Sequence, residues 1–109
     1  MSLSYNRVIA AGNLTREPEV KFINEKALCN FGMALNSTYK DKSGEKKEDT
    51  TFIDVEAWGK TAELIGQYLT KGSQCLIEGR LKLDTWTDAK NGDKRSKLKV
   101  VADSVQFIG

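Results

Sequence analysis

Apolar and polar residues alternate along much of the chain, and this alternation predicts strands. In segment 28–36, Phe31, Met33 and Leu35 alternate with small or polar residues. In segment 51–58, apolar residues occupy the odd-numbered positions from 53 to 57. A period of two is typical of a strand with one buried face. We therefore expect each segment to bury its odd-numbered side chains and to expose the even-numbered ones.

Further strands are expected on both sides of these two. A strand at 7–14 is followed, after Pro18, by a short extended piece at 19–23, which predicts a bent first strand. Segment 73–83 places four apolar side chains on one face: Cys75, Ile77, Leu81 and Leu83. An Asn-Gly turn signal then precedes a closing strand at 97–107.

Two segments break the alternation. Residues 60–69 carry apolar side chains at helical spacing, and Gly72 after Lys71 resembles a C-terminal cap, so we expect one helix there. Residues 39–50 are highly charged and have no apolar period, which predicts a long exposed hairpin loop.

The predicted order is three strands, one helix and two strands. It matches an all-β fold, the five-stranded OB-fold Greek-key barrel with one α-helix between strands 3 and 4, although other small barrels accommodate the same order. The chain has 109 residues, the size of one domain, and we treat residues 1–109 as a single unit.

Large aromatic side chains lie on strand faces that are otherwise polar. They are Phe52, Trp58 and Trp86, with Tyr39 at the base of the charged segment as a fourth candidate. Unpaired bases stack on aromatic rings without regard to sequence, so these residues indicate a site for single-stranded nucleic acid. The alternative is that they pack under loops or in a subunit interface, where such side chains are also enriched.

Basic residues are available beside these rings. Arg80 and Lys82 share the predicted face of Trp86, and Lys60 follows Trp58 closely. The net charge is only +2, from 17 basic and 15 acidic residues, but basic residues cluster in segments 40–47 and 90–99. Solvated loops explain such clusters as well as a binding site does.

Catalytic and metal sites are not indicated. The chain has no histidine, and Cys29 and Cys75 are far apart in apolar stretches, so we expect buried reduced thiols and no zinc site. The Gly-Lys-Thr at 59–61 lacks the earlier glycine of a phosphate-binding loop. Four acidic residues are interpreted as exposed solubilising charge: Asp49, Asp54, Glu56 and Glu63. We predict no enzyme activity and no cofactor.

The whole chain resembles the bacterial single-stranded DNA-binding protein family. The resemblance is carried by NRVIAAGNLTREPEVKF, by DKSGEKKEDTTF, by VEAWGKTAELIGQYLTKGSQCLIEGRLKLDTW and by the closing QFIG. It implies an OB-fold barrel, sequence-independent binding of single-stranded DNA in replication, repair and recombination, and a homotetramer, with a dimer as the alternative.

The resemblance also implies roles for individual residues. Tyr39, Phe52, Trp58 and Trp86 stand at stacking positions of the family. Six basic residues match positions that line the DNA path: Arg7, Lys21, Lys42, Lys60, Lys71 and Lys82. Asp54, Asp84 and Thr85 depart from the family pattern, because well-known members are basic there.

The remaining expectations concern context. Family members usually end in a flexible acidic tail that recruits replication and repair proteins, and this chain stops at Gly109, so such partners are expected only if the natural protein is longer. No apolar window has the ~20 residues of a membrane span, and we expect a bacterial cytoplasmic, nucleoid-associated protein. The alternatives are a replication-restart accessory protein that binds single-stranded DNA or RNA and a helicase, and a structural protein-interaction barrel.

Overall fold

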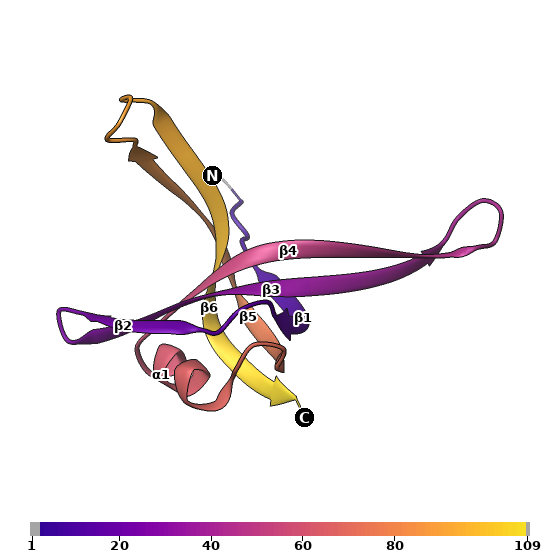
Figure 1. Cartoon of the computed structure of the whole chain (residues 1–109), viewed down its shortest axis with the longest axis horizontal. Coiled ribbons are helices and arrows are strands. Elements are labelled where there is room, and N and C mark those ends of the chain that lie inside the picture. The colour runs from indigo at the N-terminus through magenta and orange to yellow at the C-terminus, as the bar shows by residue number, and fades with distance from the viewer. Residues whose placement is uncertain (1–2, 109) are drawn as a thin grey trace.

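Six strands of the described residues, 3–108, form one sheet that closes into a barrel, and one helix packs against it in this computed structural model (Figure 1). The elements in chain order are β1 Val8–Leu14, β2 Glu19–Ile23, β3 Lys26–Lys40, β4 Lys46–Trp58, α1 Gly59–Tyr68, β5 Gln74–Thr87 and β6 Lys94–Ile108.

The strand order in the sheet is β1-β5-β6-β4-β3-β2. Neighbours are antiparallel except β4 and β6, which run parallel through residues 55–57 and 100–102. Asn13 and Leu14 of β1 also pair with β3, which closes the barrel. Both β1 and β2 lie along β3, so they are the two halves of the predicted bent first strand. The five-stranded OB-fold barrel with its helix after the third strand is confirmed.

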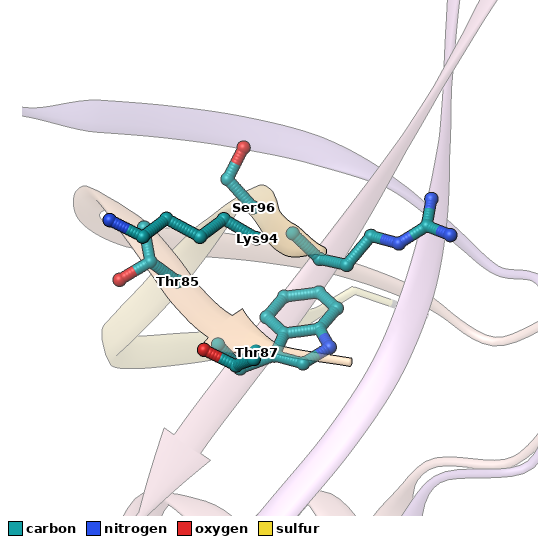
Figure 2. Close-up of a pocket in the computed structure, with 6 residues that line it drawn as sticks. Thr85, Thr87, Lys94 and Ser96 are labelled. Carbon is teal, nitrogen blue, oxygen red and sulfur yellow. The ribbon is translucent and has the colours of Figure 1, made fainter. Parts of the chain in front are cut away.

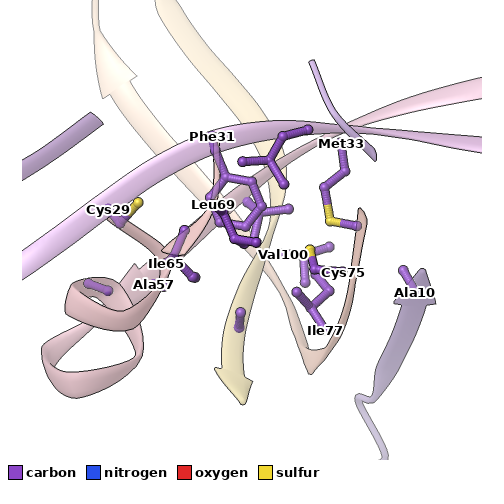
Figure 3. Close-up of a cluster of buried hydrophobic side chains, with 14 of the residues drawn as sticks. Ala10, Cys29, Phe31, Met33, Ala57, Ile65, Leu69, Cys75, Ile77 and Val100 are labelled. Carbon is purple, nitrogen blue, oxygen red and sulfur yellow. The ribbon is translucent and has the colours of Figure 1, made fainter. Parts of the chain in front are cut away.

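The core is built from the inward faces of the strands. In β3 and β4 the odd-numbered side chains point inward, and Phe31, Met33 and Val55 are fully or almost fully buried (Figure 3). Cys29 and Cys75 lie in the same cluster, buried and unpaired as expected. Burial disfavours the charged thiolate and raises the pKa of Cys29 to about 11.

Helix α1 packs against β3 and β4 and buries Ala62 and Ile65. Its bounds agree with the prediction to within one residue at each end. The predicted cap at Gly72 is wrong, because Leu69 is the C-cap residue and Gly72 lies in the next turn, with φ of +91°. There the Gly72 N–H donates to the Leu14 carbonyl oxygen at 2.8 Å. None of the described helices is long and apolar enough to cross a membrane.

The predicted long loop at 39–50 is wrong, because most of it is paired strand. Strands β3 and β4 stay paired out to Lys40 and Lys46, which leaves only residues 41–45 as a turn. In that turn the Asp41 carboxylate accepts the backbone N–H of Ser43 and of Glu45. A local hairpin satisfies its backbone groups without burying a side-chain face, so it shows no apolar period. We call residues 36–50 the β3–β4 arm, which Figure 1 shows projecting from the barrel.

The closing strand is also longer than predicted. Strands β5 and β6 remain paired out to Thr87 and Lys94, and the hairpin turn contains the predicted Asn-Gly, with Gly92 at φ of +74°. We call residues 82–98 the β5–β6 arm (Figure 1). The expectation that Leu81 and Leu83 join the core is wrong, since they are 44% and 58% exposed where β5 leaves the barrel.

Gly79 provides a test of how closely the barrel strands approach. It lies at a register irregularity of β5, and a Cβ placed on it would come within 1.9 Å of the Val101 carbonyl oxygen. Backbone cannot move aside as a flexible side chain can, so we expect Gly79→Ala to lower the free energy of unfolding by roughly 1–3 kcal/mol. Urea denaturation followed by circular dichroism measures this loss, and wild-type stability in the variant would contradict the close approach.

Candidate nucleic-acid interface

One continuous face of the sheet collects the outward side chains of three strands. Directly opposed residues of paired strands point to the same side, and the pairs between β5 and β6 are Arg80 with Val101, Lys82 with Lys99, Asp84 with Lys97 and Trp86 with Arg95. Strand β4 adds its even-numbered residues, because Glu56 pairs with Val101. The outer face comprises Phe52, Asp54, Glu56, Trp58, Arg80, Lys82, Asp84, Trp86, Arg95, Lys97, Lys99 and Val101.

Three of the four predicted aromatic residues share this outer face. Phe52 is 72% exposed and Trp86 is 49% exposed, so both rings present area to solvent. Trp58 is half-buried, and its indole Nε1–H donates to the Glu56 carboxylate at 2.9 Å. The ammonium of Lys26 lies 5.5 Å from the centre of the Trp58 ring. Trp58 was predicted from the sequence, but Lys26, the cation beside it, was not.

Tyr39 is exposed but lies on the other side of the β3–β4 arm. It pairs with Lys47, whereas Phe52 pairs with Ala34, and odd- and even-numbered residues of β3 point to opposite faces. The structure therefore separates Tyr39 from the aromatic residues of the outer face.

A pocket of about 400 Å³ lies in the β5–β6 arm, with Trp86 among the residues that line it. Its lining residues are Thr85, Trp86, Thr87, Lys94, Arg95 and Ser96. Thr85 pairs with Ser96 and Thr87 pairs with Lys94, so these four side chains, labelled in Figure 2, lie on the opposite face of the arm from Trp86 and Arg95. The ring of Trp86 and the paired cation Arg95 suit a base and a phosphate on one face, and Lys94 adds a cation on the other. Neither Lys94 nor Arg95 was predicted individually, although both belong to the basic cluster at 90–99.

Four of the predicted cations lie on the outer face or beside it. Arg80 and Lys82 are part of the face, and Arg80 binds Asp103 at 2.9 Å. Lys60 is exposed in the first turn of α1, two residues after Trp58. Lys21 pairs with Leu28, which in turn pairs with Trp58, so Lys21 points to the same side.

The other three predicted cations are dispersed. Lys42 lies in the turn of the β3–β4 arm, and Lys71 lies in the turn before β5, at the opposite end of that strand from Trp86. Arg7 precedes β1 and binds the Glu78 carboxylate at 2.7 Å. The structure does not gather these three with the aromatic residues.

Glu56 corrects the expectation that the acidic residues are exposed, because it is only 5% exposed. Its carboxylate accepts a hydrogen bond from the Lys99 ammonium at 2.6 Å, and Lys99 also binds Asp84. Burial raises the pKa of Glu56, but hydrogen bonds from Lys99 and Trp58 and the positive charges of Lys99 and Lys82 outweigh burial and lower it below 4.5. Glu56 is therefore a charged group that holds a cation and an aromatic ring in place.

Asp54 is likewise engaged by cations. Lys97 lies 3.0 Å from one of its carboxylate oxygens and Arg16 lies 3.6 Å from the other. The sequence analysis missed Arg16, Lys97 and Lys99, although the alternate basic residues of the closing strand were a usable signal. Within residues 3–108, no three acidic, cysteine or histidine side chains converge on a metal site.

Comparison with known proteins gives one consistent group. Residues 5–108 match the sequence profile described as "Single-strand binding protein family". The chain is 47% identical to a single-stranded DNA-binding protein of Wolinella succinogenes and 45% identical to one of Helicobacter hepaticus, over 95% of its own length in both cases. It spans 64% and 61% of the length of these two relatives.

A solved structure agrees with these relatives. The crystal structure of a deletion mutant of the single-stranded DNA binding protein from Thermus aquaticus matches with a TM-score of 0.82 and 29% identity. The match covers 96% of this chain and 51% of that one.

The lowered pKa of Glu56 predicts a pH dependence of stability. A carboxylate whose pKa is lower in the folded state stabilises the fold above its unfolded pKa, and that stability is lost as the pH falls through the folded value. We expect the free energy of unfolding of the wild type to fall as the pH drops below 4.5, and Glu56→Gln to flatten this fall. At neutral pH the variant should lose about 1–3 kcal/mol, because Gln removes the charge that pairs with Lys99 and its single oxygen cannot accept from both Lys99 and Trp58.

Urea denaturation at a series of pH values tests both effects. Glu63→Gln, which removes an exposed carboxylate of α1, is the control. If Glu63→Gln flattened the acid dependence as much as Glu56→Gln, the pairing of Glu56 with Lys99 would not be the cause.

Proposed function

The chain belongs to the single-strand binding protein family, and from this we propose that it binds and protects single-stranded DNA without reading its sequence. One observation carries the proposal: three aromatic rings and a row of cations, drawn from separate hairpins, share the outer face of the barrel. Rings accept any base by stacking and cations accept any phosphate, so neither contact selects a sequence.

In this proposal bases stack on Phe52, Trp58, Trp86 and Tyr39. The exposure of Phe52 and Trp86 supports direct contact with bases. Trp58 offers a ring whose orientation is fixed by Glu56, so little freedom is lost when a base stacks on it. Tyr39 lies on the other side of the β3–β4 arm. Stacking of a base on Tyr39 therefore requires the DNA to pass around that arm.

Phosphates are proposed to bind the seven predicted cations, which are Arg7, Lys21, Lys42, Lys60, Lys71, Arg80 and Lys82. Their wide distribution supports a path that wraps around the domain instead of following one groove. We propose three further phosphate contacts, which are Lys26 beside Trp58, Arg95 beside Trp86, and Lys94 on the other face of the β5–β6 arm. We propose that the β3–β4 arm and the β5–β6 arm contact the bound DNA from opposite ends of the outer face.

We further propose that the domain assembles as a homotetramer. Within the described residues, positions 8–12 of β1 pair only with β5, so the other edge of this strand is open to a second copy. Ile9, Leu83 and Leu98 are each at least 58% exposed, which supports burial against another subunit.

The relatives are bacterial proteins that extend beyond the matched segment. For the natural protein we propose a nucleoid-associated role in DNA replication, repair and recombination. Recruitment of replication and repair proteins would depend on such an additional segment.

Tryptophan fluorescence tests the binding proposal directly. We expect oligo(dT) to quench the emission of the wild-type protein, because stacking on Trp58 and Trp86 changes the surroundings of both indoles. Duplex DNA of equal length should have little effect, since its bases are already stacked. No quenching by oligo(dT) at low salt would contradict the proposal.

Substitution of Trp86 tests the proposed site. We expect Trp86→Ala to weaken binding of a labelled oligo(dT), measured by anisotropy, by about 1–3 kcal/mol through the loss of one stacking surface. Tyr68→Ala is the matched control, because Tyr68 is an exposed aromatic residue of α1 that packs against Phe107, away from the outer face. Equal losses in the two variants would count against Trp86 as a stacking residue.

Sedimentation equilibrium tests the assembly. We expect the mass of about four chains for the wild type without DNA. A monomer at all concentrations would contradict the homotetramer, and a dimer would limit the assembly to one interface.

A further inference from the structure

Asp54 occupies a position where a binding site for a polyanion would be expected to avoid negative charge. It lies on the outer face, on β4 between Phe52 and Trp58. Its side chain is 37% exposed, so it is accessible to a bound strand. A phosphate passing over this part of the face would meet a carboxylate.

The contacts of Asp54 nevertheless form a specific arrangement. Lys97 from β6 and Arg16 from the segment between β1 and β2 bind its two different oxygens. Asp54 pairs with Gly32 in β3, and a Cβ placed on Gly32 would come within 2.8 Å of the Arg16 guanidinium. The guanidinium therefore lies across Gly32, which has no side chain to block its approach to Asp54.

The two cations remain available to an outside anion. The side chains of Arg16 and Lys97 are 49% and 52% exposed, in contrast to Lys99, which is 14% exposed against Glu56. An exposed ion pair contributes little net free energy and exchanges readily, whereas a buried pair is costly to break. The outer face thus holds one fixed ion pair, Glu56 with Lys99, and one exchangeable cluster, Asp54 with Arg16 and Lys97.

We propose that Asp54 is an internal counterion, which DNA phosphates displace from Arg16 and Lys97 when a strand binds. This inference rests on the proposed function and adds Arg16 and Lys97 to the phosphate contacts. In the free protein Asp54 neutralises the two cations in place of solution anions. Binding exchanges one protein carboxylate for phosphates at these cations, so they contribute less to the salt dependence than unpaired cations would.

The test compares Asp54→Asn with the wild type by anisotropy of a labelled oligo(dT) over a range of NaCl concentrations. Removal of the competing charge should tighten binding at low salt about fivefold. The plot of log K against log[NaCl] should become steeper by up to about 0.7, because the one carboxylate neutralises only one positive charge. Glu63→Gln makes the same change of charge on the exposed face of α1 and should leave affinity and slope unchanged.

A double-mutant cycle with Lys97→Met separates competition from simple repulsion. If Asp54 occupies Lys97 in the free protein, loss of Lys97 should weaken binding by a factor that is about twofold or more greater in the Asp54→Asn background than in the wild type. Additive effects would overturn the inference, because repulsion between Asp54 and DNA does not depend on Lys97. Unchanged or weaker binding by Asp54→Asn would overturn it too.

Two further measurements keep the result unambiguous. Thermal unfolding shows whether Asp54→Asn is folded, and Asp54→Ser repeats the test with a smaller neutral side chain. Wild-type protein that fails to bind oligo(dT) at low salt would overturn both the proposed function and this inference. Wild-type binding with the same salt slope in both Asp54 variants would overturn the inference alone.

Discussion

The parallel pairing of β4 with β6 places the β3–β4 and β5–β6 hairpins side by side, and β1 joins the same two hairpins through its pairs with β3 and β5. The β4–β6 pairing spans only residues 55–57 and 100–102, but it brings the outward side chains of β4 into line with those of β5 and β6. Glu56 can bind Lys99, 43 residues further along the chain, only because this pairing exists. The β4–β6 pairing therefore determines which residues meet on the outer face.

The sequence predicts the parts of this structure that depend on local pattern. Alternation identifies the barrel portions of β3 and β4, including the inward Phe31 and Val55, because burial on one face leaves a period of two. It fails for the arms, where strands pair with each other but bury neither face. Leu81 and Leu83 illustrate this limit, because they continue the alternation of β5 beyond the point where the barrel covers it.

Charge partners are less predictable, because they depend on register between distant strands. The sequence places Asp54 and Glu56 on one face, but nothing local distinguishes the buried carboxylate from the exposed one. The difference arises from Lys99 and Trp58, which enclose Glu56, whereas Asp54 lies near the more exposed Arg16 and Lys97. Composition alone conceals these pairs, since opposite charges cancel in a net charge of +2.

This cancellation bears on how such a domain can hold a polyanion. Long-range attraction is weak at a net charge of +2, and several cations of the outer face are already paired within the protein. In the proposed function, contacts that do not depend on net charge would then supply much of the binding free energy, and stacking at about 1–3 kcal/mol per base is of the right size. Stacking requires rings held at fixed positions, and the paired strands of the barrel and its arms supply that rigidity. The buried carboxylate of the outer face serves this need, because Glu56 accepts from the ring N–H of Trp58 and holds Lys99 beside it.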